Sequence, residues 1–131
     1  MTTASVSRTP KMISTRDGPV GWIVFNNPAR RNAVSVDMWT ALADIVHDYA
    51  SDPAIRVIVV RGAGGKAFVS GADISEFEQQ RSTPESTEIY RQLSERATKA
   101  LQVVGKPTIA MIEGLCIGGG VSVPLSCDLR L

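Results

Sequence analysis

The sequence is poor in the side chains on which most metal sites and catalytic triads depend. It has one histidine, His47, and two cysteines, Cys116 and Cys127. A histidine-based triad needs a histidine beside its nucleophile, and zinc sites use several His or Cys ligands at short spacing. His47 falls on the exposed side of a predicted helix, so we exclude both kinds of site within this chain and expect no metal. We interpret the cysteines as inert buried thiols rather than a disulfide or a nucleophile.

The sequence also lacks an excess of one charge and any long apolar run. Its formal net charge is +1 over 131 residues, which gives no reason to expect nucleic acid or an anionic membrane as a partner. No apolar segment approaches the roughly 20 residues that cross a bilayer, and the polar start has no signal-peptide core. We therefore expect a cytoplasmic protein without nucleic-acid or membrane partners, and the length suits one domain.

Periodicity divides residues 12–131 into strands and helices after a flexible arm at residues 1–11. The expected strands are 12–15, 20–25, 55–60, 68–73, 108–112 and 128–131. The expected helices are 36–50, 74–81, 83–104 and 121–127. The helix at 83–104 is predicted to start with a capping box from Ser82 to Glu85. The first two strands predict a hairpin, and a strand, a helix and a strand over 55–112 predict a parallel crossover, hence an α/β fold.

Two glycine-containing turns follow predicted strands and lead toward predicted helices. They are Ser70-Gly71-Ala72-Asp73 and Cys116-Ile117-Gly118-Gly119-Gly120. Backbone N–H groups at such turns point beyond the carboxyl ends of the strands, where ligands of α/β sheets bind. Two N–H donors that converge from separate turns form an oxyanion hole, which holds an oxygen that gains charge during a reaction. The alternative is that these glycines only allow close packing of a helix on a strand. The residues alone leave both readings open, and neither a dinucleotide fingerprint nor a P-loop is present.

Three motifs together resemble a known family. They are Asn27-Pro28-Ala29-Arg30-Arg31-Asn32-Ala33, Ala67 to Ile74, and Lys106-Pro107 through Gly118-Gly119-Gly120 to Asp128. In this order and spacing they are similar to the crotonase superfamily, also called the enoyl-CoA hydratase/isomerase superfamily. The resemblance implies an α/β spiral of ββα units that forms homotrimers or hexamers. It also implies acyl-CoA thioester substrates and no separate cofactor, since coenzyme A is part of the substrate.

The resemblance also assigns site residues. The backbone N–H groups of Ala72 and Gly119 would hold the thioester oxygen and stabilise an enolate. Substrate-binding positions carried over from the family are Ala29, Arg30, Arg31, Ser70, Asp73, Ile74 and Gly118. The alternative for the two arginines is ordinary solvated charge on a loop.

The sequence departs from the hydratases of this family at Ser122. They carry an acid/base glutamate two residues after the glycine triplet, and a serine hydroxyl does not exchange protons near neutral pH as a carboxylate does. Their second glutamate would lie beyond Leu131, so we expect a truncated unit. Glu113 is a weaker candidate for the acid. Two alternatives therefore stay open: a non-catalytic acyl-CoA-binding or assembly module, and a dienoyl isomerase, decarboxylase or hydrolase of the same family.

Overall fold

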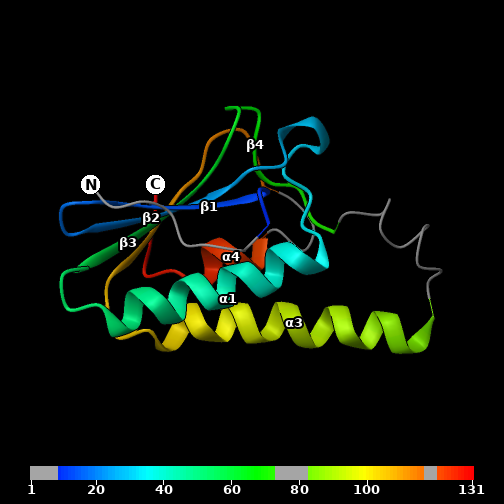
Figure 1. Ribbon diagram of the computed structural model, residues 1–131. Helices are drawn as coiled ribbons and strands as arrows, with labels where there is room; N and C mark the ends of the chain where they lie inside the picture. The colour runs from blue at the N-terminus through cyan, green and yellow to red at the C-terminus, as the bar shows by residue number, and fades with distance from the viewer. Residues whose placement is uncertain (1–8, 73–82, 117–120) are drawn as a thin grey trace.

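A five-stranded sheet organises the fold in the computed structural model, which describes residues 9–72, 83–116 and 121–131. The strand order is β1-β2-β3-β5-β7 (Figure 1). The strands are β1 (Met12–Asp17), β2 (Val20–Phe25), β3 (Val57–Gly62), β5 (Thr108–Met111) and β7 (Leu129–Arg130). β1 pairs antiparallel with β2, and every later pair is parallel. The predicted hairpin and the predicted parallel crossover are both confirmed.

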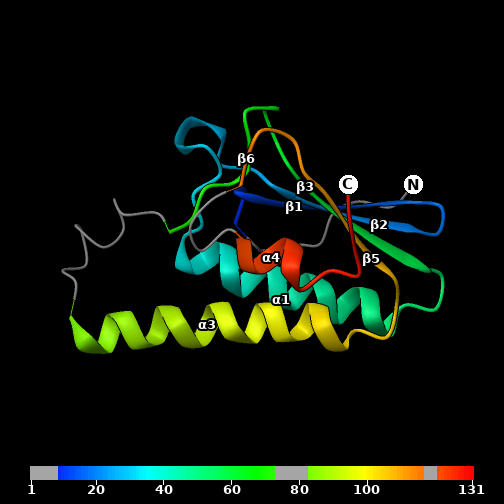
Figure 2. The same ribbon diagram turned by 180° about the vertical axis from the view of Figure 1, so that it is seen from behind.

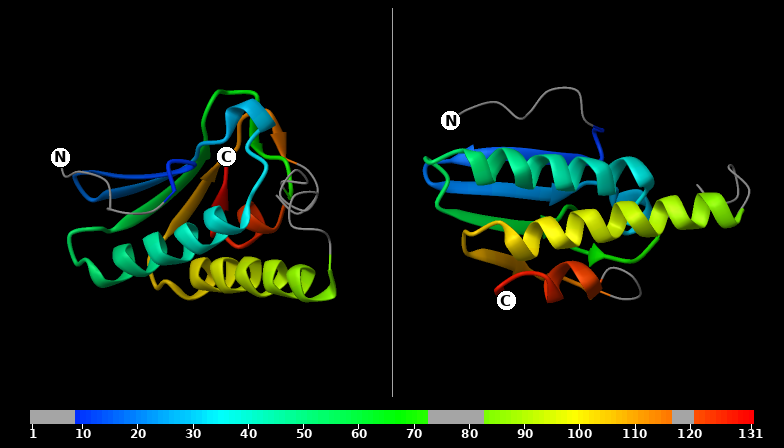
Figure 3. Two further views of the ribbon diagram at one scale, coloured as in Figure 1. Left: turned by 45° about the vertical axis from the view of Figure 1, so that its right-hand side comes forward. Right: turned by 90° about the horizontal axis from the view of Figure 1, so that it is seen from below.

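Three helices lie on one face of this sheet, as Figures 1 and 3 show. They are α1 (Val36–Ser51), α3 (Pro84–Val103) and the short α4 (Ser122–Leu125). The long helices α1 and α3 pack side by side, while α4 contacts β5 and β7. No helix in the described ranges is long and apolar enough to cross a membrane.

The core lies between the helices and the sheet, and α1 contributes more buried residues to it than any other described element. Tyr49 of α1 is fully buried, and its hydroxyl reaches the carbonyl oxygens of Thr15 at 3.0 Å and Trp22 at 2.8 Å. Gly21 provides the space for this ring, because a Cβ there would lie 2.7 Å from the ring carbons. His47 is exposed on the outer side of α1, as predicted.

Several boundaries differ from the sequence prediction. The strand predicted at 68–73 is β4, which ends at Val69, and the helix predicted at 121–127 is shorter, from Ser122 to Leu125. β3 begins at Val57 and runs to Gly62, two residues later than expected, because its register is set by pairing with β2, from Val20 to Phe25. The cap of α3 is Thr83, not Ser82. Its Oγ accepts a hydrogen bond from the Ser86 N–H at 3.1 Å, and this puts proline at the first helical position,.

A second, two-stranded sheet stands on the side of the main sheet away from the helices (Figures 1 and 2). It consists of β4 (Ala67–Val69) and β6 (Leu115–Cys116), which run parallel, and the 3₁₀ turn η1 (Pro28–Arg30) lies beside it. β6 is absent from the sequence prediction, since a two-residue strand has no periodicity. Cys116 and Cys127 are both thiols and are not joined in a disulfide. Cys127 is buried as expected, whereas Cys116 is only partly buried because it lies on β6 of this small sheet.

Candidate functional site

The two glycine-containing turns leave from neighbouring strands. β4 and β6 pair in parallel, with Val69 opposite Cys116. Ala72 follows Val69 by three positions, and Gly119 follows Cys116 by the same number. The two strands that precede these turns therefore run in the same direction and end at the same edge of one small sheet. Ala72 is described, but Gly118, Gly119, Asp73 and Ile74 lie outside the described residues.

The peptide group between Gly71 and Ala72 is held from one side. The Val34 N–H donates a hydrogen bond of 2.7 Å to the Gly71 carbonyl oxygen, and Val34 and Ala72 form an isolated parallel bridge. Because a trans peptide directs its C=O and N–H in opposite directions, the Ala72 N–H points away from Val34. Among the backbone hydrogen bonds of the described residues, none has this N–H as its donor. It is a donor whose direction is set by the hydrogen bond from Val34 to Gly71 O.

The segment that carries Val34 is fixed by two asparagines. Asn32 is fully buried, and its amide donates to the carbonyl oxygens of Ala63 at 3.0 Å and Ala67 at 2.8 Å. Its side-chain oxygen accepts from the Asn27 N–H at 2.8 Å, and the Asn27 amide donates to Ala33 O at 2.8 Å. Arg31 and Asn32 adopt left-handed backbone angles, with φ of 52° and 58°. Asparagine tolerates that region better than most residues. The sequence identifies this motif, but it does not predict that the Asn32 side chain is buried and bonds to the loop before β4.

A cavity of about 290 Å³ adjoins this segment. Its wall is formed by η1 and the residues after it, together with the loop between β3 and β4. The lining residues are Pro28, Ala29, Arg31, Asn32, Ala63, Gly64, Lys66 and Ala67. Two of these are cationic, Arg31 and Lys66, and both are exposed at the surface. Lys66 was not predicted as a site residue, because in the sequence it is a single charge in a glycine-rich loop.

The other predicted substrate-binding residues lie close by. Ala29 lines the cavity, whereas Arg30 is exposed and does not line it. The Ser70 hydroxyl donates to the Arg30 carbonyl oxygen at 3.4 Å, which links η1 to the turn after β4. The structure thus brings Ala29, Arg31 and Ser70 into one neighbourhood with Ala72. Cationic side chains near a directed N–H donor can hold an anionic or strongly polarised ligand.

Ser122 begins α4, immediately after residues that the structure does not describe. It is exposed, and its carbonyl oxygen accepts from the Ser126 N–H at 3.1 Å and the Ser126 hydroxyl at 2.7 Å. Pro124 falls in the first turn of α4, where a missing N–H breaks no helical hydrogen bond,.

Glu113, the other candidate for the acid, is also exposed. Every carboxyl pKa shift resolved among the described residues is downward, at Asp37, Asp52 and Glu88. None of these carboxyls is tuned toward a general acid, which needs a raised pKa.

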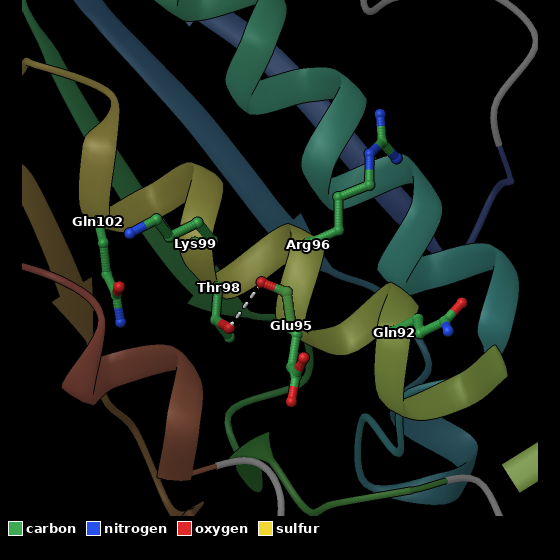
Figure 4. Close-up of a pocket in the computed structure, with 6 residues that line it drawn as sticks. All are labelled: Gln92, Glu95, Arg96, Thr98, Lys99 and Gln102. Carbon is green, nitrogen blue, oxygen red and sulfur yellow. Dashed lines mark hydrogen bonds between the residues drawn. The ribbon is translucent and has the colours of Figure 1, made fainter. Parts of the chain in front are cut away.

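A larger hollow lies on α3 and differs from this site in its lining. Its volume is about 500 Å³, and Figure 4 shows the side chains that surround it. They are Gln92, Glu95, Arg96, Thr98, Lys99 and Gln102. All six are polar residues of one helix, and Arg96 is paired with Asp44 of α1 at 3.0 Å. It contains none of the predicted site residues, so the cavity beside η1 is the better candidate.

Comparison with known families gives a match over most of the chain. Residues 15–131 match the family model described as enoyl-CoA hydratase/isomerase. The chain belongs to the enoyl-CoA hydratase/isomerase family. Its α/β fold is the crotonase fold of that family, present here in truncated form. The resemblance inferred from the three motifs is therefore confirmed.

Relatives in this family differ in the reactions that their names state. The chain is 36% identical over 122 residues to the hydroxycinnamoyl-CoA hydratase-lyase of Pseudomonas fluorescens, covering 91% of this chain and 44% of that protein. It is 34% identical over 117 residues to the rat Delta(3,5)-Delta(2,4)-dienoyl-CoA isomerase, covering 82% of this chain and 36% of the relative. The chain therefore spans less than half the length of these enoyl-CoA hydratase/isomerase family relatives.

A solved structure gives the same result for the fold. The enoyl-CoA hydratase/carnithine racemase of Magnetospirillum magneticum superposes with a TM-score of 0.87 at 35% identity. The match covers 93% of this chain and 46% of that protein. The family fold thus accounts for nearly all of the chain.

Proposed function

We propose that the protein acts on acyl-CoA thioesters as a hydratase or isomerase, and that this chain supplies an oxyanion site which stabilises a thioester enolate. The observation that carries the proposal is the Gly71–Ala72 peptide. Its carbonyl is bound by Val34 at 2.7 Å, so its N–H is directed to the opposite side without a described acceptor. A preorganised donor of this kind is what an oxygen that gains negative charge requires.

The pairing of β4 with β6 supports a second donor in the following turn. Val69 and Cys116 are in register, and Ala72 and Gly119 each follow three residues later. We propose that the Gly119 N–H converges with the Ala72 N–H on the thioester oxygen. Loss of one oxyanion donor typically lowers kcat by about 10² to 10³.

The cavity beside η1 supports a place for the coenzyme A part of the substrate. Arg31 and Lys66 line it, and cationic side chains form charge-assisted hydrogen bonds with phosphate oxygens. Ala29, Arg30 and Ser70 belong to the same neighbourhood, and we assign them to substrate binding with Asp73, Ile74 and Gly118. As in the sequence-based expectation, we propose a homotrimer or hexamer, which sedimentation would test.

The proposal is tested by replacing Ala72. Ala72→Pro deletes the N–H, whereas the matched control Ala72→Gly keeps it. Calorimetry with crotonyl-CoA measures binding, and loss of the enoyl absorbance measures hydration. We expect turnover to fall about 100-fold or more in Ala72→Pro and to persist in Ala72→Gly. Equal turnover in a folded Ala72→Pro variant refutes the oxyanion assignment, and binding without turnover in the unsubstituted protein supports a non-catalytic binding or assembly module.

Ser122 favours a second candidate within the family. Ser122 begins α4 where family hydratases carry a glutamate, and a hydroxyl orients water or substrate without acting as the acid/base group. One relative is named a dienoyl-CoA isomerase, and the same enolate or oxyanion device serves isomerases, decarboxylases and thioester hydrolases. Isomerisation of a dienoyl-CoA and release of free thiol, each compared with hydration of crotonyl-CoA, decide between these reactions.

A further inference from the structure

We propose that Tyr90 is a positioning residue for the Gly71–Ala72 peptide and acts on it through Val34. Tyr90 lies on α3, and its hydroxyl donates a hydrogen bond of 2.9 Å to the Val34 carbonyl oxygen. The Val34 N–H donates in turn to Gly71 O at 2.7 Å. Helix α3 is thereby connected to the candidate oxyanion donor by two consecutive hydrogen bonds.

Val34 is held through both of its backbone polar groups. Its side chain is fully buried, and its N–H and C=O are each bound, one to Gly71 and one to Tyr90. The ring of Tyr90 meets that of Trp39 edge to face, with centroids 6.4 Å apart and planes at 87°. This contact fixes the ring from the α1 side, so the hydroxyl has a defined direction.

The consequence of the Tyr90 hydrogen bond is geometric. A bond that fixes Val34 by its carbonyl also fixes the direction of its N–H, and hence the plane of the Gly71–Ala72 peptide. Hydrogen bonds in a chain also polarise one another, by about 10 to 30% for each bond. Donation by Val34 to Gly71 O therefore makes the Ala72 N–H a stronger donor. The Val34 C=O and N–H belong to different peptide groups, so the Tyr90 hydroxyl acts on this donor only by holding Val34 in place. Removing that hydroxyl releases Val34 on one side and lets the Gly71–Ala72 peptide shift.

The two tyrosines of the sequence provide a matched pair of variants. Both hydroxyls bind backbone carbonyl oxygens, Tyr90 at Val34 and Tyr49 at Thr15 and Trp22. Tyr90→Phe and Tyr49→Phe each remove one oxygen atom from a comparable hydrogen bond. Only the first removes it from the segment that holds Gly71.

The positioning role is tested first without substrate, by NMR of the Ala72 amide. Labelling glycine with ¹³C at the carbonyl and alanine with ¹⁵N selects the two Gly-Ala pairs of the sequence, Gly62–Ala63 and Gly71–Ala72. We expect Tyr90→Phe to move the Ala72 amide proton resonance and leave that of Ala63 unmoved, and Tyr49→Phe to leave that of Ala72 unmoved. An unchanged Ala72 resonance in Tyr90→Phe, or equal shifts in both variants, overturns the proposal. Should Tyr90→Phe not fold, 3-fluorotyrosine in the Tyr49→Phe protein changes only the Tyr90 hydrogen bond, and the Ala72 resonance must then move.

The catalytic consequence rests on the proposed function and is measured separately. In the protein that hydrates crotonyl-CoA, we expect Tyr90→Phe to lower kcat about three- to tenfold with KM nearly unchanged, a fraction of the loss caused by deleting a donor. Tyr49→Phe should retain its kcat. Equal losses in both variants overturn the catalytic role. If the unsubstituted protein neither binds nor converts crotonyl-CoA, the proposed function fails, and the positioning of the peptide is still decided by the Ala72 resonance.

Discussion

Replacement of Gly114 by alanine tests how tightly β6 is held against β4. Gly114 has φ of +76°, and a Cβ on it would lie 2.2 Å from the Lys66 carbonyl oxygen and 2.5 Å from its carbon. The next residue, Leu115, donates its N–H to that same oxygen at 3.1 Å. The methyl group of alanine therefore meets backbone atoms that no rotamer change can move away.

Gly105 provides the control for this substitution. Its φ is +77°, almost the same angle, but nothing lies within 4 Å of the position of its Cβ. Gly105→Ala therefore reports the backbone cost alone, about 1 to 2 kcal/mol for the left-handed conformation, reduced by the lower entropy of the unfolded alanine chain. Gly114→Ala adds the clash and the weakened Leu115 hydrogen bond, which together cost about 2 kcal/mol more.

The measurement is urea unfolding of both variants beside the unsubstituted chain. We expect a loss of about 1 kcal/mol in Gly105→Ala and about 3 kcal/mol in Gly114→Ala. Since β6 leads into the turn with Gly119, Gly114→Ala should also weaken acyl-CoA binding, whereas Gly105→Ala should not. Equal losses of stability in the two variants would refute the reasoning, because the close approach of β6 to Lys66 would then carry no energetic cost.

Three further predictions concern the hydrogen bonds of Asn32, the cationic side chains of the cavity and the buried thiol of Cys127. Asn32→Ala removes the hydrogen-bond partner of Ala63 O, Ala67 O and the Asn27 N–H. It should lower the free energy of unfolding by about 2 to 4 kcal/mol. A loss below about 1 kcal/mol in urea unfolding would show that the Asn32 side chain does not hold this segment. Arg31→Ala and Lys66→Ala should each weaken coenzyme A binding about three- to tenfold, and the loss should be smaller at high salt because both groups are exposed. If calorimetry shows an unchanged affinity in both variants, the cavity does not bind coenzyme A. Burial raises the pKa of the Cys127 thiol to about 11, so the folded state keeps a proton that the unfolded chain loses at lower pH. The free energy of unfolding, measured from pH 8 to pH 11, should therefore fall as the pH rises above about 9. Cys127→Ala should make that fall smaller.

The sequence by itself determined the regular elements and the chemical limits of the site. The spacing of apolar residues predicts α1, the hairpin of β1 and β2 and the crossover from β3 to β5, because these patterns depend on local periods of 3.6 and 2 residues. The single histidine and Ser122 limit the available proton-transfer groups without any structure. The three motifs also sufficed to predict the family, which the match over residues 15–131 confirms.

Only the tertiary structure decided how the candidate site is held. The hydrogen bonds from Asn32 to Ala67, from Val34 to Gly71 and from Tyr90 to Val34 join residues 35 to 56 positions apart. β6 is two residues long and is a strand only because β4 lies beside it. A local pattern carries no information about such partners, since each bond forms where distant segments meet in the folded chain. For the same reason Tyr90 reads as an ordinary helical residue in the sequence and becomes a support of the Gly71–Ala72 peptide in the fold.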